Sequence, residues 1–176
     1  MKTALNIRLH SIRLACETFP NCETWCWCAG LFGTYTLCAL LLGWLTGFCR
    51  LELMKASAWV IVSTPIVLFV MPCLAEEFFF RAVLLPHPGE AIAPRATFFW
   101  AAVSLMAFVG SHPINGLVSR RSVFLDPVFL VLATLLGIVC TITYLKSGSI
   151  WMPVLLHWFT VVVWIMFLGG WQKVTP

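Results

Sequence analysis

The chain has 176 residues, of which 61% are hydrophobic and only 10% are charged, and its mean hydropathy is +0.95. These values exclude an ordinary soluble globular domain and are typical of a multi-pass integral membrane protein. The formal net charge of +4 is too small and too dispersed to favour a nucleic-acid partner, and contact with anionic lipid explains it better.

Residues 1–20 are expected to form a short surface segment. Leu9 and Ile12 lie at helical spacing beside Arg8 and Arg13, which is typical of an amphipathic helix on a membrane surface. No apolar core of a secretory signal peptide follows within this stretch. We therefore predict an N-terminal surface segment, 1–20, and a single transmembrane domain, 21–176.

Five uncharged apolar runs follow, and each is long enough, or nearly so, for a helix to cross roughly 30 Å of hydrocarbon. The runs cover residues 24–49, 56–75, 96–119, 127–145 and 147–172. The expected fold class is therefore all-α, a polytopic transmembrane bundle of about five spanning helices plus the N-terminal amphipathic segment. Lys and Arg are divided equally between the two sides, so the positive-inside rule does not orient the bundle.

Eight cysteines would indicate a disulfide framework in a small secreted domain. Here most of them lie in or beside apolar runs, where a thiol behaves as a small hydrophobic side chain. The denser cluster of Cys22, Cys26 and Cys28 lacks a second Cys-x-x-Cys and a nearby histidine pair. We interpret this cluster as packing residues with reduced thiols, and a zinc or redox role is the alternative.

Residues 75–85 carry two adjacent carboxylates and an arginine inside an apolar segment. A carboxylate in hydrocarbon costs roughly 3 kcal/mol on insertion scales, so it is seldom present without a reason. On a helix that continues through Phe80, Glu77 and Arg81 share one face, whereas Glu76 points about 100° away. The spacing predicts one structural carboxylate, held by Arg81, and one working carboxylate that faces a cavity. A simple intrahelical ion pair that makes insertion tolerable is the alternative.

Two histidines also interrupt apolar runs, His112 near the end of the third run and His157 within the fifth. Counted at about 1.5 Å per residue from the side of the membrane that these helices share, Glu76 lies roughly 14 Å deep, His157 about 10 Å and His112 about 22 Å. Helix tilt can bring the three side chains together. Taken singly, His112 also fits an interfacial position, and His157 fits a hydrogen bond to a neighbouring helix.

A glutamate with two histidines forms a small set of acid–base groups. A carboxylate among apolar groups can take a proton from water near neutral pH, and a histidine can position that water or protonate a leaving amine. A second histidine can stabilise the oxyanion of a tetrahedral intermediate. Together these groups suit hydrolysis of an amide bond.

The motifs Glu-Glu-x-x-x-Arg (Glu76, Glu77, Arg81) and Phe-x-x-x-His (Phe108, His112), with His157 in a late apolar helix, resemble those of the CPBP intramembrane proteases. That family includes the type II CAAX prenyl endopeptidases and bacterial relatives tied to bacteriocin processing and immunity. The resemblance covers roughly residues 56–170. It implies a glutamic-type endopeptidase in which Glu76 and His112 activate water, Glu77 and Arg81 support the motif helix, and His157 helps to form the oxyanion site. It favours no metal cofactor, although a Glu/His/His set can in principle bind zinc.

The chain departs from the family pattern at Val161, because the family usually has Asn or Asp four residues after the late histidine. Asn115 is a candidate replacement as oxyanion donor. The chain is also short, and short bacterial members look like processing enzymes that cut near the C-terminal membrane anchor of a partner protein. The resemblance thus implies a protein of the bacterial inner membrane whose partners are the lipid bilayer and a membrane-anchored protein or peptide substrate.

Three other functions stay open. A non-catalytic scaffold or immunity protein that retains the motif is favoured by Val161. A transporter or proton relay can use the same buried carboxylate, but the sequence shows no inverted repeat. A metal-dependent version of the protease is a chemical variant of the glutamic-type endopeptidase. The sequence does not indicate a cleavage site or an oligomeric state.

Overall fold

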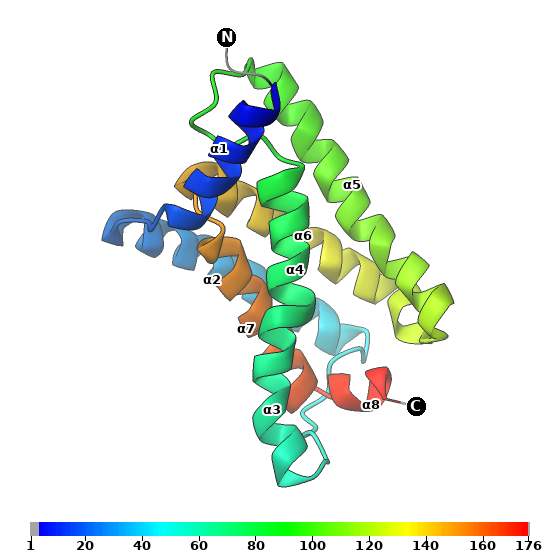
Figure 1. Cartoon of the computed structure of the whole chain (residues 1–176). Coiled ribbons are helices and arrows are strands. Elements are labelled where there is room, and N and C mark those ends of the chain that lie inside the picture. The colour runs from blue at the N-terminus through cyan, green and yellow to red at the C-terminus, as the bar shows by residue number, and fades with distance from the viewer. Residues whose placement is uncertain (1–3, 176) are drawn as a thin grey trace.

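The computed structural model describes residues 4–175, so residues 1–3 of the predicted surface segment and residue 176 lie outside the described part (Figure 1). Within it the chain forms helices and no named strand. In chain order the helices are α1 (Ala4–Glu17), α2 (Cys22–Leu45), α3 (Ala58–Leu68), η1 (Phe69–Leu74), α4 (Ala75–Glu77), η2 (Phe78–Val83), α5 (Pro94–Ser119), η3 (Ser122–Leu125), α6 (Pro127–Ser147), α7 (Trp151–Phe167) and α8 (Gly170–Val174). The expected all-α class is confirmed.

Four helical stretches in residues 4–175 are long and apolar enough to cross a membrane. They are α2, the continuous stretch Ala58–Val83, α5 and α6. The fifth predicted run yields a shorter helix, α7, which has 17 residues. It ends at Phe167 because the chain turns at Gly169, whose positive φ of 76° is readily available only to glycine, before the short α8 begins.

The second span bends just before the two glutamates. Met71 leaves helical geometry (φ −135°, ψ 119°) because the ring of Pro72 disfavours the α region for the residue that precedes it. Helical geometry then continues past Glu77 through η2, as the sequence predicts. We refer to α4 and η2 together, residues 75–83, as the motif segment.

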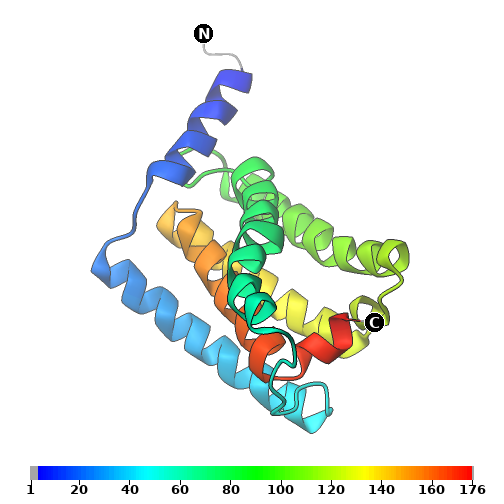
Figure 2. The same cartoon turned by 60° about the horizontal axis from the view of Figure 1, so that its bottom comes forward.

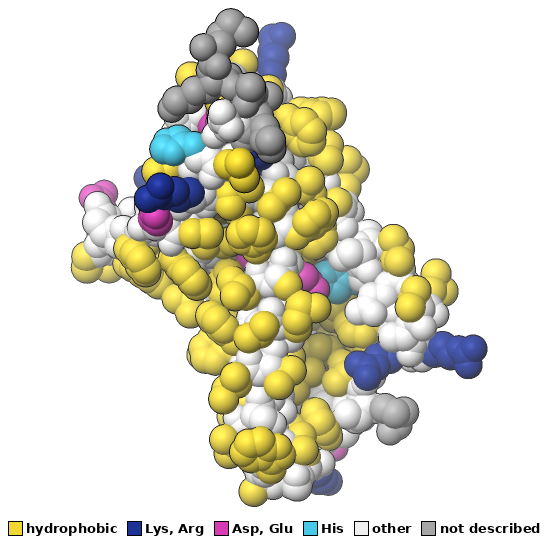
Figure 3. Space-filling model, viewed as in Figure 1, with side chains coloured by type: hydrophobic (Ala, Val, Ile, Leu, Met, Phe, Trp, Pro, Cys, Tyr) yellow, Lys and Arg dark blue, Asp and Glu magenta, His cyan; other side chains and the backbone are white. Residues whose placement is uncertain are grey.

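Helix α6 lies at the centre of the bundle. It packs against α2, α5 and α7, while α7 also contacts α3 and η1, and α5 contacts η2 (Figures 1 and 2). Half of the most apolar part of α6 is buried, against at most 17% in the other three long spans, which leave most of their surface for lipid. Hydrophobic side chains accordingly cover most of the face shown in Figure 3, and Lys and Arg lie towards its ends.

The close approach of α6 to α5 depends on Gly137. A Cβ atom at this position would lie 2.7 Å from Leu105 Cδ1 and 2.9 Å from Phe108 Cδ1, closer than carbon atoms normally approach. A small residue at a helix crossing lets two backbones come together in this way. Phe108, which is fully buried, therefore packs directly on α6.

The N-terminal helix predicted within residues 1–20 is present as α1, which contacts η2. Its location on a membrane surface stays a prediction. In the cysteine cluster of α2, Cys22 and Cys26 are exposed, Cys28 is buried, and all three are free thiols.

Candidate active site

Glu77 and Arg81 form a fully buried pair on the motif segment. Arg81 Nε lies 3.1 Å from Glu77 Oε2, and neither side chain is exposed. Arg81 Nη2 also donates a hydrogen bond to the backbone oxygen of Gly137 at 3.1 Å, and its guanidinium lies 4.6 Å from the centre of the Phe108 ring. The ion pair predicted from the four-residue spacing is thus present, and it also fixes the motif segment against α5 and α6.

His157 in α7 is bound to the same carboxylate. Its Nδ1 lies 2.9 Å from Glu77 Oε1, and because an ionised carboxylate only accepts hydrogen bonds, Nδ1 is the donor. The second ring nitrogen, Nε2, is the one left for other partners. The sequence allows a hydrogen bond from His157 to a neighbouring helix, which is present. Glu77 as the partner is not predictable, because nothing in the sequence indicates which of two adjacent glutamates faces a histidine 80 residues away.

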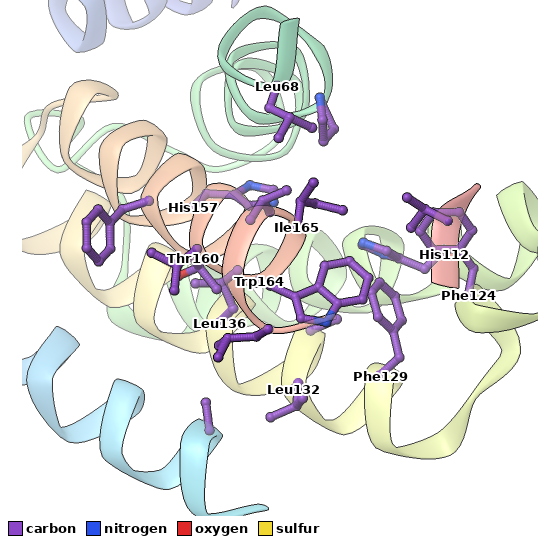
Figure 4. Close-up of a pocket in the computed structure, with 18 of the residues that line it drawn as sticks. Leu68, His112, Phe124, Phe129, Leu132, Leu136, His157, Thr160, Trp164 and Ile165 are labelled. Carbon is purple, nitrogen blue, oxygen red and sulfur yellow. The ribbon is translucent and has the colours of Figure 1, made fainter. Parts of the chain in front are cut away.

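The three predicted catalytic residues, Glu76, His112 and His157, line one cavity of about 480 Å³. Asn115 and Val161 line it as well, and the rest of the wall is mostly apolar and comes from α2, α3, α5, α6 and α7. Figure 4 shows His112 and His157 reaching it from two different helices. The structure therefore brings together the residues that the depth count placed up to roughly 12 Å apart along the membrane normal.

Glu76 differs from Glu77 because its carboxylate has no ion-pair partner among the described residues and borders open space. Its Oε2 atom is buried and has no hydrogen-bond partner among the described residues. Glu76 shares with His112 and Asn115 a second, smaller recess of about 280 Å³ between the motif segment and α5. In Figure 3 an acidic and a histidine side chain lie next to each other at mid-height within the hydrophobic face. The predicted working carboxylate thus borders two open spaces.

His112 is held by the turn of helix that precedes it. Its Nδ1 donates to the backbone oxygen of Phe108 at 2.9 Å, since a carbonyl oxygen can only accept. Nε2 is thereby left as the free nitrogen of His112. The ring of Phe108 also packs edge-on against both histidines, with centroid distances of 4.9 Å to His112 and 5.8 Å to His157. Phe108 thus spaces the two imidazoles.

Val161 lies one turn after His157 and also lines the cavity, so the position at which the motif resemblance leads us to expect an amide or a carboxyl group is apolar. The hydroxyl of the adjacent Thr160 donates to the backbone oxygen of Leu156 at 2.9 Å. Within residues 4–175, no group of three or more His, Cys, Asp or Glu side chains is arranged to hold a metal ion. Asn115, the predicted replacement for the missing oxyanion donor, borders both open spaces together with Glu76 and His112.

Comparison with known families supports the motif-based resemblance. The family described as type II CAAX prenyl endopeptidase, Rce1-like, matches residues 57–163, which is more than half of the chain and includes every predicted site residue. The chain belongs to this Rce1-like family. It is therefore a member of a CAAX protease family, with an integral membrane location and a protein substrate as its general properties. No curated protein and no solved structure matches the chain. In this Rce1-like protein, α1 and α2 lie outside the matched residues.

Proposed function

We propose that this chain is a glutamic-type intramembrane endopeptidase in which Glu76 and His112 activate a water molecule and no metal takes part. The observation that carries the proposal is the difference between the two glutamates. Glu77 accepts a hydrogen bond from His157 through one oxygen and forms an ion pair with Arg81 through the other, whereas Glu76 Oε2 has neither a hydrogen bond nor an ion-pair partner among the described residues and lies beside His112. Adjacent carboxylates with opposite surroundings are what separate structural and acid–base roles require.

In the proposed reaction, Glu76 removes a proton from a water molecule as the water oxygen bonds to the carbonyl carbon of the substrate. His112 orients that water through Nε2, which is free because Nδ1 binds Phe108. The tetrahedral intermediate then collapses, the C–N bond breaks, and the proton held by Glu76 passes to the leaving amine. Proton transfer by positioned side chains of this kind contributes roughly 10²- to 10⁴-fold to a rate.

The oxyanion of the intermediate requires hydrogen-bond donors. His157 already donates Nδ1–H to Glu77, so its Nε2 can donate only when the ring is an imidazolium, whose positive charge lies next to the Glu77 carboxylate. The Asn115 amide borders the same cavity. We assign His157 as the charged oxyanion donor and Asn115 as the neutral one, in place of the family residue that Val161 replaces.

We further propose that the substrate is a membrane-anchored protein or peptide of the bacterial inner membrane, cut in or near its membrane-associated C-terminal part. The mostly apolar wall of the cavity fits a nonpolar stretch of chain better than a charged one. The small recess between the motif segment and α5 is a second route by which such a chain can reach Glu76.

The test compares substrate processing in native membranes by the wild type, Glu76→Gln and a control, Glu23→Gln, which makes the same change at an exposed position of α2. Glu76→Gln is expected to abolish cleavage at an unchanged protein level, whereas the control and a zinc chelator have no effect. Normal processing by Glu76→Gln would instead show that the assignment of Glu76 is wrong and would favour the non-catalytic scaffold over the glutamic-type protease. Loss of processing with chelator would establish the metal-dependent variant.

A further inference from the structure

Arg8 reaches from α1 to the end of the motif segment. Its Nε and Nη2 atoms donate to the backbone oxygen of Val83, the Nε contact being 3.0 Å, and Nη2 also donates to Leu85 O at 3.0 Å. Nη1 pairs with Glu90 Oε1 at 3.1 Å. The last carbonyls of a helix lack intrahelical donors, and a cation there complements the helix dipole. Arg8 therefore caps the motif segment.

The other end of α1 is attached to the start of α7. The backbone N–H of Ile150 donates to Ala15 O at 2.9 Å, and Trp151 Nε1 donates to Cys16 O at 2.8 Å. The ring of Phe19, just beyond α1, stacks on Trp151 with a centroid distance of 6.3 Å. The last carbonyls of α1 thus find their donors on α7, which carries His157.

An apolar cluster fills the space between these two attachments. Ala15 of α1 is fully buried there against residues of the motif segment and its end, of α6 and of α7. The buried members are Ala15, Ala82, Leu85, Tyr144, Ile150 and Val154. In Figure 1, α1 lies across this end of the bundle. It is a bridge between the two helices that carry the buried glutamate and its histidine.

The bridge adds to the direct links between the second span and α7, which also packs against α3 and η1. Trp158 Nε1 donates to Pro65 O at 2.8 Å on one side of the site, His157 binds Glu77 at 2.9 Å within it, and α1 joins the two helices on the other side. A hydrogen bond of this length weakens steeply when its partners move apart or tilt. A displacement of the motif segment relative to α7 at either end would therefore weaken the central contact.

We propose that Arg8 is a positioning residue for catalysis. Resting on the proposed function, this inference makes α1 a brace that holds the motif segment against α7, so that Glu77 keeps His157 and Glu76 keeps facing the cavity. The brace lies outside the residues that match the family. Arg8 touches no reacting atom in this scheme.

The experiment uses the full chain in lipid nanodiscs and compares wild type with Arg8→Gln, Arg8→Lys and Arg13→Gln. Arg13 is the matched control because it lies on the same helix and pairs only with Glu17 at the exposed surface. Two quantities are measured: kcat and KM for a processed substrate, and hydrogen–deuterium exchange of the peptide containing the Ile150 amide. The exchange measurement reports docking of α1 without requiring any activity.

Arg8→Gln is expected to lower kcat on the order of 10- to 100-fold with KM unchanged, because a displacement of about 1 Å can cost 100-fold, and to speed exchange at Ile150. Arg8→Lys keeps a charged donor for the two carbonyls, so its kcat and its exchange rate at Ile150 are expected to lie close to those of the wild type. Arg13→Gln is expected to match the wild type in both quantities. If Arg8→Gln speeds exchange but leaves kcat unchanged, α1 is only attached and the proposal is wrong. A lower kcat with Ile150 still protected also overturns it.

Failure of the proposed function is separately visible, because the wild type then shows no cleavage although its Ile150 exchange is still slow. If Arg8→Gln does not accumulate in the membrane, Glu90→Gln takes its place. That variant keeps both carbonyl contacts of Arg8 and removes the negative charge of its partner, while the amide oxygen of glutamine can still accept from the backbone N–H of His87. A smaller loss of kcat with the same unchanged KM supports the proposal, and an unchanged kcat with faster exchange overturns it.

Discussion

Glu76 and Glu77 are adjacent in sequence, yet only one of them has its charge balanced by the protein. The helical period alone predicts this division, because it places Arg81 on the face of Glu77 and turns Glu76 away. The helical period does not predict that His157 binds Glu77, because that hydrogen bond depends on how α7 packs against the motif segment. The ion pair was therefore predictable from the sequence, whereas the hydrogen bond that leaves His157 a single free nitrogen was not, and the roles of the candidate site residues stay predictions.

The two glutamates are expected to respond differently to the same substitution. Glu77→Gln leaves Arg81 as an uncompensated buried charge, so it should lower the free energy of unfolding by about 3 kcal/mol as well as abolish cleavage. Glu76→Gln should abolish cleavage without lowering stability, because Glu76 Oε2 has no partner to lose. Thermal unfolding in detergent measures the stability of each variant, and the cleavage assay measures its activity. If Glu77→Gln is as stable as Glu76→Gln, the pair of Glu77 and Arg81 is not structural.

The oxyanion assignment leads to a paired prediction. Asn115→Ala is expected to reduce kcat by roughly 100-fold with little change in KM, the effect of removing one oxyanion donor. Val161→Asn places an amide one turn after His157 on the cavity wall and should recover part of this loss in the double variant. Single-turnover cleavage rates measure both effects. An Asn115→Ala variant as fast as the wild type would remove Asn115 from the mechanism.

Among the elements, the crossing of α5 and α6 should be the most sensitive to a small change. Gly137→Ala puts a methyl group against Leu105, whose end can move, and against Phe108, whose ring is held between Arg81 and the two histidines. We expect a loss of about 1–3 kcal/mol in the free energy of unfolding, as is usual for overpacking, and reduced cleavage. Gly33→Ala in α2 is the control, because a Cβ there meets nothing within 4 Å. Equal melting temperatures of the two variants would contradict the proposed fit.

Most elements were predictable from the sequence, since uncharged runs of about 20 residues leave few alternatives to a spanning helix. The extension of the second span past the glutamates was predictable for the same reason. The early end of α7 was not, because the apolar run continues beyond Phe167 and the turn at Gly169 depends on contacts with residues near Arg50 and Glu52. The docking of α1 was also missed, because its contacts are mainly with backbone atoms, which leave no trace in a sequence pattern.

At the scale of the whole molecule, the number of crossings decides the topology. Four helices are long enough to span by length and composition, and α7 is the short fifth. We predict that α7 also crosses, which places α1 and α8 on opposite sides of the membrane, as their positions at opposite ends of the bundle indicate (Figure 1). Reporter fusions at the two termini, active on one side only, should give opposite signals. Equal signals would mean an even number of crossings.

The convergence of the site is also a property of the whole molecule. Counting residues along straight helices leaves His112 and His157 at different depths. In the structure α5 and α7 are inclined to each other (Figure 2), and both histidines line one cavity. Helix inclination is set by side-chain contacts among several spans, which a single sequence does not specify. The candidate residues and their order along the chain could therefore be read from the sequence. That Glu76, His112 and His157 line one cavity is known only from the structure.

The contact between α1 and α7 can form only late in synthesis of the chain. Cys16 receives its hydrogen bond from Trp151, 135 positions later, so nearly the whole chain must be synthesised before this contact exists. Chains fold progressively from the N-terminus during synthesis. Glu76 and His112 are thus already made while α7 and the completed brace are still missing. On the proposed function, the growing polypeptide is a silent precursor, and proteolysis begins only when its last membrane helix is in place.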